Sequence, residues 1–145
     1  TLFRSHGALN IDTITLAALV HNIGVLPILT EAERHEEVFA NPTFLAQAIH
    51  KLAGRIGSTI MKAWDFPTDF IEVTDKWSNF DYQTDKPSYV DFIRIAAIHT
   101  KVLKEVENKG AIFDDYVDKG ILPSVDFMKS DEFIAALEEV RAVFA

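Results

Sequence analysis

The sequence predicts an all-α fold, a compact bundle of several helices, and three observations support it. Apolar residues recur every three or four positions along most of the chain, as they do on the buried side of a helix. No segment alternates apolar and polar residues in the way that is typical of a half-buried strand. The stretches between the apolar runs hold residues that start or end helices, chiefly Asn, Ser, Pro and Gly. At 145 residues the chain is long enough for one domain with its own core.

The first element is the most apolar stretch, residues 16–29, which reads LAALVHNIGVLPIL. Asn10 or Asp12 can cap a helix that continues through Ile23. Because this helix is apolar on all sides, we expect it to lie inside the core with the other helices packed around it.

An imidazole and a carboxamide interrupt this stretch, at His21 and Asn22. Gly24 is expected to end the helix in the left-handed conformation, and Pro27 follows it. A polar pair in a buried turn is costly unless each group finds a hydrogen bond or a ligand. His21 and Asn22 are therefore the first candidate functional residues. The simplest structural interpretation of His21 is a core imidazole bonded to a backbone carbonyl.

Two helix starts follow. Thr30 and Glu33 have the spacing of a capping box, which predicts a short, charged helix to about Val38. Asn41 and Pro42 then open a long helix, with Asn as the cap and Pro at the first position. Its apolar positions recur at helical spacing: Phe44, Leu45, Ala48, Ile49, Leu52, Ile56, Ile60 and Met61.

Gly54 and Gly57 weaken this long helix and are expected to let another backbone come close. Residues 64–67 end it, and a new helix opens after Pro67. A polar linker follows at residues 78–87, SNFDYQTDKP.

The last third of the chain predicts two further helices. One should run from Ser88 and close at Gly110. Gly120 and Pro123 then break the chain, and Ser130 caps the final helix.

The composition excludes several classes of function. Without cysteine the chain has no disulfide framework, no thiolate metal site and no cysteine nucleophile. A net charge of −8 would repel a phosphate backbone unless basic residues were segregated, and the sequence suggests no basic patch, so we expect no nucleic-acid partner. No signal peptide is visible, and no uncharged apolar run reaches roughly 18 residues. We therefore expect no membrane insertion and a cytoplasmic location.

Two motifs together resemble the HDOD family. They are LAALVHNIG, residues 16–24, and GSTIMKAWDFP, residues 57–67, which an aromatic-rich helix follows. The resemblance extends over about residues 16–106. HDOD domains are relatives of the HD phosphohydrolases, all-helical proteins in which histidines and aspartates bind divalent metal and hydrolyse phosphate esters. The resemblance implies a single HDOD-like helical domain over residues 1–145, in a longer polypeptide whose preceding helices are missing here.

The metal ligands of the catalytic relatives are mostly replaced at the matching positions. His21 matches the histidine of the family's His-Asp pair, but Asn22 stands at the aspartate. Ala53, Trp77 and Ser78 stand where many relatives carry histidines. An amide oxygen brings no charge to hold a divalent cation. These five residues are predicted to be remnants of a metal site or to line a ligand pocket, with no catalytic residue, no metal and no cofactor.

Two further positions bear on a metal site. Ala96 and Ala97 stand near the place of the relatives' closing aspartate. A different set of imidazoles and carboxylates could still converge on a metal, drawn from His21, His50, His99, Glu33, Glu36 and Glu37. No H-x3-H or H-E-x-x-H spacing supports that alternative.

The resemblance implies a non-catalytic bacterial signal-transduction or regulatory domain. It would act through contacts with a partner protein or a fused signalling domain, and homo-oligomers are compatible with it. One alternative is a divergent HD-type metal-dependent phosphohydrolase with an altered ligand set. Another is a small-molecule sensor that uses the vacated metal pocket, lined by His21, Asn22 and Trp77.

The packing carries two expectations. Five or more helices should bury one set of apolar residues in a single core: Ala17, Leu19, Ile49, Ile60 and Phe92. If preceding helices are missing, one side of the helix through Ile23 should form an exposed apolar patch or be buried against another copy.

Overall fold

The computed structural model describes residues 9–100 and 106–144 of the chain. Within these residues it contains helices, turns and no strand, so the predicted all-α fold is confirmed. The helices in chain order are α1 (Ile11–Val20), α2 (Val25–Glu33), α3 (Glu36–Phe39), α4 (Pro42–Ala63), α5 (Thr68–Lys76), α6 (Tyr89–His99), α7 (Lys109–Asp118), the 3-10 helix η2 (Phe127–Lys129) and α8 (Asp131–Phe144).

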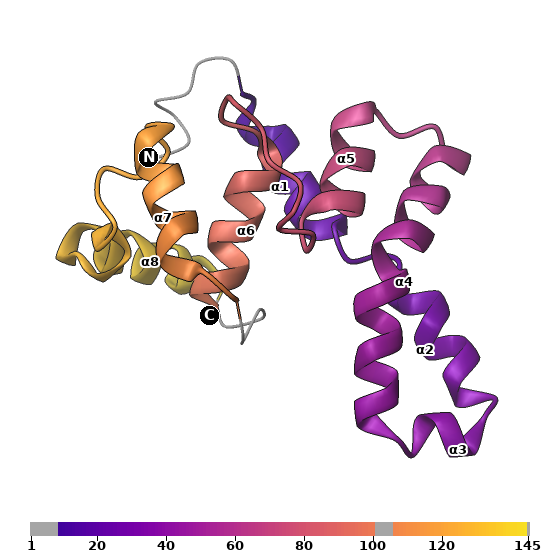
Figure 1. Ribbon diagram of the computed structural model, residues 1–145. Coiled ribbons are helices and arrows are strands. Elements are labelled where there is room, and N and C mark those ends of the chain that lie inside the picture. Colours follow the sequence, from indigo (N-terminus) through magenta and orange to yellow (C-terminus); the bar gives the residue numbers. More distant parts are fainter. Residues whose placement is uncertain (1–8, 101–105, 145) are drawn as a thin grey trace.

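The helices form a bundle with one projecting arm (Figure 1). α1 lies between α5 and α6 and contacts both, while α4 packs along α5. α7 and α8 lie on the far side of α6. α2, α3 and the first half of α4 pack on one another and project away from the bundle as the arm.

Four helix starts were predicted correctly because each depends on local chemistry. The Asn10 side chain accepts hydrogen bonds from two backbone N–H groups at the start of α1, and Asn41 does the same once for α4. Ser88 and Asp91 form a reciprocal capping box at the start of α6. The Ser130 hydroxyl accepts from a backbone N–H of α8.

Three predicted boundaries are wrong. The first helix, expected to continue through Ile23, ends at Val20. Thr30 does not start a helix: it lies inside α2, and its hydroxyl donates to the Leu26 carbonyl 3.0 Å away. The helix from Ser88 ends at His99 rather than at Gly110, which is the second residue of α7. α7 itself was not predicted. Residues 101–105 of the predicted helix lie outside the described residues.

The core is divided by α6, which buries apolar residues on two sides. One cluster joins α1, α4, α5 and α6 and contains Ala17, Met61, Phe70, Val73, Trp77, Val90, Ile93 and Ala97. The second joins α6 to α7 and the turn after it and contains Ile95, Ile98, Phe113, Tyr116, Ile121 and Leu122. The chain is therefore organised around α6 and not around residues 16–29 as predicted.

The predicted single core is only partly correct. Ala17 is buried, Ile49, Ile60 and Phe92 are half-buried, and Leu19 is 78% exposed. Among the described residues, α5 and α6 pack on α1 while α3 and α4 pack on α2, and Leu19 on the remaining side of α1 stays uncovered.

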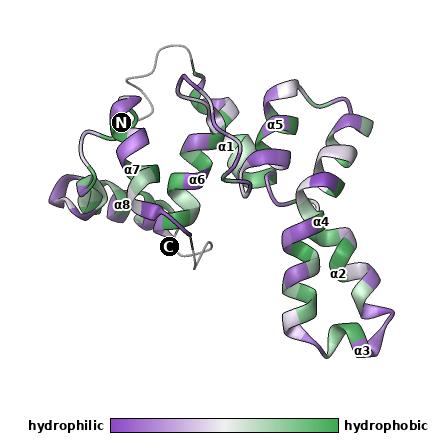
Figure 2. Ribbon diagram, in the orientation of Figure 1, coloured by the Kyte–Doolittle hydropathy of each residue, from purple (hydrophilic) through white to green (hydrophobic). Residues whose placement is uncertain are grey.

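The exposed apolar residues of α1 and α2 include Leu16, Leu19 and Leu26. Figure 2 shows how much of these two helices is hydrophobic. The predicted apolar patch is thus present. By length and composition alone, the stretch Ile11–Glu33 could cross a membrane, which is weak evidence because a helix that packs inside a protein passes the same test. The absence of membrane insertion stays a prediction.

Candidate functional site

His21 lies in the turn that follows α1, half-buried against α5. Its Nδ1 is 2.6 Å from the Ala18 carbonyl oxygen. A carbonyl only accepts, so the proton is assigned to Nδ1 and the remaining lone pair to Nε2. The imidazole also meets the Trp77 ring edge-on, with centroids 4.7 Å apart and planes at 90°. The geometry agrees with an imidazole that is bonded to a backbone carbonyl and packed on an aromatic ring.

Asn22 is not brought together with His21 in a ligand-like pair. It is exposed, whereas His21 is half-buried. Its backbone carbonyl oxygen accepts a hydrogen bond from the Val25 N–H, and this bond shapes the turn into α2. The turn therefore presents a carboxamide to solvent at the position where the resemblance places the aspartate of the His-Asp pair.

Ala53 lies where the turn before α2 crosses α4. A Cβ on Gly24 would be 1.9 Å from the Ala53 carbonyl oxygen and 2.7 Å from the Gly57 nitrogen, so the two backbones are in direct contact. The close approach expected at Gly57 is confirmed. The prediction that Gly24 is left-handed is wrong, because its φ is −65°. Glycine is needed here because a side chain would collide with the backbone of α4.

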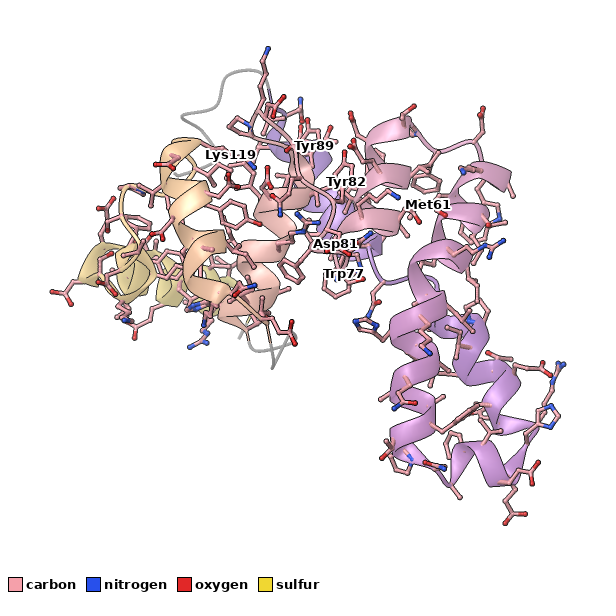
Figure 3. The ribbon with its side chains drawn as sticks, viewed as in Figure 1. Met61, Trp77, Asp81, Tyr82, Tyr89 and Lys119 are labelled. Atoms are coloured by element: carbon pink, nitrogen blue, oxygen red, sulfur yellow. The ribbon has the colours of Figure 1, made fainter. Side chains whose placement is uncertain are left out.

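Trp77 and Ser78 follow each other at the end of α5 but serve different surroundings. Trp77 is buried in the first core cluster (Figure 3), and its carbonyl accepts from Arg94 Nε at 3.1 Å. Ser78 instead lines a cleft between α4 and α7. Of the five predicted residues, the structure joins His21 to Trp77 and places Ala53 beside the same turn, while Asn22 and Ser78 face elsewhere.

The described residues do not fit a divalent metal. Within residues 9–100 and 106–144, no three histidine or carboxylate side chains converge. His50 lines the cleft, and His99 packs on the Phe133 ring at 5.0 Å in another part of the molecule. The alternative cluster of histidines and glutamates is therefore not formed there. A hydrolytic metal site needs several such ligands aimed at one point.

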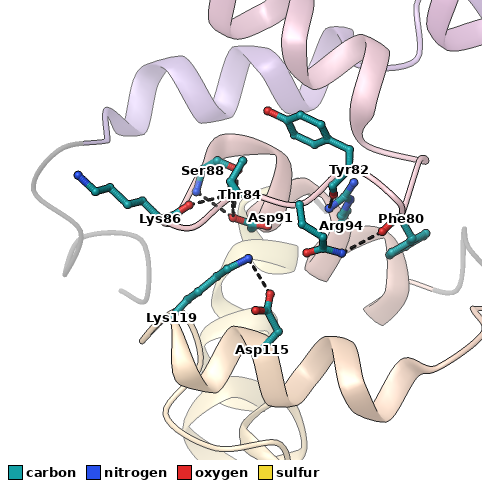
Figure 4. A network of polar contacts seen from close by, with 10 residues as sticks. Phe80, Tyr82, Thr84, Lys86, Ser88, Asp91, Arg94, Asp115 and Lys119 are labelled. Atoms are coloured by element: carbon teal, nitrogen blue, oxygen red, sulfur yellow. Dashed lines mark hydrogen bonds and ion pairs between the residues drawn. The ribbon is translucent and has the colours of Figure 1, made fainter.

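Sequence reasoning missed the main buried polar residue, Arg94, which is 1% exposed. Its guanidinium donates to backbone carbonyls in and after the last turn of α5. Figure 4 shows Arg94 beside one of these acceptor residues, Tyr82. These carbonyls belong to Lys76, Trp77, Asn79 and Tyr82. Arg94 thereby ties the α5–α6 linker to α6 and fixes Trp77 beneath His21. An arginine within the apolar helix YVDFIRIAAI was the signal that could have revealed it.

Asp91 is equally buried and holds the other end of the same linker. Its Oδ2 accepts from the Ser88 backbone N–H at 2.9 Å, from the Ser88 hydroxyl at 3.0 Å and from Thr84 at 3.4 Å. The carboxylate is thus used in capping α6 and is not free for a metal. Its spacing from Ser88 is a capping-box pattern that the sequence shows.

Two tyrosines near this network have raised pKa values. The hydrogen bond that Tyr82 donates to the Glu72 carboxylate, assisted by burial, raises the pKa of Tyr82 to about 12. Burial is the main cause that raises the pKa of Tyr116 to about 12. Neither phenol can serve as a general base near neutral pH.

Tyr116 gives a prediction about alkaline stability. The pKa of Tyr116 is about 12 in the folded protein and near 10.0 in the unfolded chain. The neutral phenol therefore contributes its full stabilisation below pH 10.0, and this contribution is lost as the pH rises to about 12. Between these values, the free energy of unfolding should fall by about 3 kcal/mol more in the natural protein than in Tyr116→Phe. Urea unfolding across this range measures both slopes. Equal slopes would contradict the prediction.

A large cleft lies apart from His21. Its volume is about 1370 Å³, and it is lined by α4, the linker and α7. An ion pair between Lys119 Nζ and Asp115 Oδ2, 2.6 Å apart, lies in its wall, with the lysine side chain 8% exposed (Figure 4). The lysine is already neutralised by its own helix, so this wall offers no free buried charge to a ligand.

One solved structure resembles the whole described architecture. It is the crystal structure of a "putative metal-dependent phosphohydrolase" from Shewanella amazonensis SB2B, with 39% sequence identity and a TM-score of 0.86. The fold is HD-like. The match covers 97% of this chain and 50% of the other, so the chain spans about half the length of that protein. No protein-family model matches the chain, and no curated protein matches it.

Proposed function

We propose that this chain is a non-catalytic regulatory domain of the HDOD type that acts through contacts with other protein segments. The observation that carries the proposal is the state of His21. Its Nδ1 is used by the Ala18 carbonyl, its ring packs on Trp77, and the neighbouring Asn22 is exposed. One imidazole with no converging carboxylate is too small a ligand set for a hydrolytic cation.

The uncovered face of α1 and α2 supports action by protein contact. Large exposed apolar patches mark surfaces that bind other protein segments. The proposal includes a bacterial, cytoplasmic setting and a partner that is either a separate protein or a fused signalling domain.

A metal-dependent phosphohydrolase is the second candidate, and one specific observation favours it. The similar crystal structure is described as such an enzyme at 39% identity. For this chain to work in that way, ligands beyond the described residues would have to complete the site around His21. The vacated-pocket sensor has less support, because the His21 and Trp77 rings are in contact and the large cleft lies elsewhere.

Metal analysis and phosphodiesterase assays separate the two candidates. We expect protein purified without chelator to carry no stoichiometric iron, manganese or zinc, and to leave nucleotides, cyclic dinucleotides and model phosphodiesters intact when manganese is added. Asn22→Asp should not restore activity, because one carboxylate leaves the other ligands missing. Stoichiometric metal with turnover that His21→Ala abolishes would replace the regulatory proposal with the phosphohydrolase.

A further inference from the structure

α4 differs from the rest of this acidic chain because all of its charged residues are cations. Its 22 residues include Lys51, Arg55 and Lys62 and no acidic residue, although the chain has 22 acidic and 14 basic residues. At about 100° per residue, the three cations share one exposed side of the helix. None of them forms an ion pair within the part of the chain that the structure describes. Lys51 and Arg55 also line the cleft described above, whose other lining residues include Asp75, Asp81, Asp85, Asp115 and Asp118. The cations are thus grouped along α4 but not apart from acidic residues, and the expected absence of a nucleic-acid partner stays a prediction.

The same side of α4 carries apolar anchors. Phe44, Ala48 and Leu52 recur every four residues, and Phe44 and Leu52 are 52% and 46% exposed. We call this side, from Phe44 to Lys62, the basic stripe. Exposed apolar residues at this spacing beside cations are the pattern that receives an amphipathic acidic helix.

α8 has the complementary pattern. Asp131, Glu132, Glu138 and Glu139 are exposed on it, with Arg141 as its one basic residue. Val140 and Val143 are 55% and 79% exposed, and α8 contacts the rest of the fold mainly through η2. Glu132, Glu139 and Val143 lie at helical spacing on one side, which we call the acidic stripe.

We propose that the chain self-associates, with the acidic stripe of one copy lying antiparallel on the basic stripe of another. This inference deepens the proposed function by naming a contact surface and its occupant. The distance along the helix axis is the same in both stripes. Phe44 and Arg55 are 11 residues apart, as are Val143 and Glu132, which is about 16 Å at 1.5 Å per residue. When Val143 lies over Phe44, Glu132 therefore meets Arg55.

In the same register the intervening residues also match. Glu139 lies over Ala48, three residues or about 4.5 Å along the axis from Lys51, which two long side chains can bridge, and Ala136 lies over Lys51 and beside Leu52. α4 and α8 lie at opposite ends of the molecule (Figure 1), so two copies side by side can form this contact twice. Nucleic acid is a weaker occupant, because the net charge of −8 repels a phosphate backbone outside the stripe.

Sedimentation equilibrium of the whole chain tests the proposal. We expect concentration-dependent association that weakens as salt is added. Lys51→Glu with Arg55→Glu should weaken association at least about tenfold, and Glu132→Lys with Glu139→Lys should do the same. The four substitutions together should restore it. All four sites are exposed, so circular dichroism should show an intact fold.

The matched control reverses two exposed lysines outside both stripes, Lys86→Glu with Lys109→Glu, and should leave association unchanged. A monomer at every concentration would overturn the proposal, as would association that survives reversal of the basic stripe, or duplex DNA binding lost on that reversal. None of these results touches the metal and phosphodiesterase assays. Conversely, turnover in those assays would remove the proposed function and leave the association measurement valid.

Discussion

Replacing Arg94 by methionine should lower the free energy of unfolding by roughly 3–5 kcal/mol. The buried guanidinium is the hydrogen-bond donor for four backbone carbonyls, those of Lys76, Trp77, Asn79 and Tyr82. Methionine fills similar space but donates nothing. These carbonyls would then have to find water or stay unpaired, and an unpaired buried acceptor costs more than its hydrogen bond contributed.

Urea unfolding followed by circular dichroism measures this effect. Arg55→Met is the matched control, because Arg55 is exposed and the same change there should alter stability by no more than about 0.5 kcal/mol. Arg94→Lys keeps the charge but not the planar fork, so it should retain only a minor part of the stability. If Arg94→Met stayed within 1 kcal/mol of the natural protein, the linker would not depend on this residue.

The helix starts were predictable because capping is a local interaction. Asn41 with Pro42, Ser88 with Asp91, and Ser130 each satisfy backbone groups within three residues of themselves. Thr30 shows the limit of the same pattern. Its hydroxyl bonds to the carbonyl four residues earlier, inside a helix that had already begun, so the backbone never adopts the extended cap conformation.

Burial was harder to predict because it depends on what covers a helix. The stretch 16–29 is apolar on all sides, yet Leu19 is 78% exposed, because the described helices that contact α1 and α2 leave one side of α1 uncovered. α6 is less uniformly apolar and still divides the core, because it lies between two groups of helices. The sequence predicts Gly110 as a helix end, but in the structure it is the second residue of α7, a position that glycine also tolerates.

The five candidate site residues stay a prediction, and the structure brings only some of them together. The contact of His21 with a carbonyl was expected, and the carbonyl turned out to be that of Ala18, within the same helix end. The resemblance implied that His21 and Trp77 lie near each other, but not that their rings are in direct contact, because that contact depends on where Arg94 holds the end of α5. Buried arginines bonded to backbone carbonyls leave no partner pattern in the sequence, since a carbonyl is present at every residue.

Gly24→Ala should lower the free energy of unfolding by about 3 kcal/mol, at the upper end of the cost of overpacking. Its φ of −65° suits alanine, so backbone entropy alone would make the substitution stabilising by about 0.5–1 kcal/mol. The added Cβ, however, would lie 1.9 Å from the Ala53 carbonyl oxygen. That oxygen belongs to the α4 backbone and cannot rotate away, so the turn carrying His21 would have to leave α4.

The sign of the change in the free energy of unfolding therefore shows whether backbone entropy or the steric clash dominates at Gly24. Gly110→Ala is the matched control, since a Cβ there meets nothing within 4 Å and should stabilise α7 by about 0.5–1 kcal/mol. Urea unfolding of both variants supplies the comparison. If Gly24→Ala were as stable as Gly110→Ala, the contact between the His21 turn and α4 would be looser than 1.9 Å implies. The expected loss would instead show that the position of His21 is set by backbone packing at a residue too small to bear a side chain.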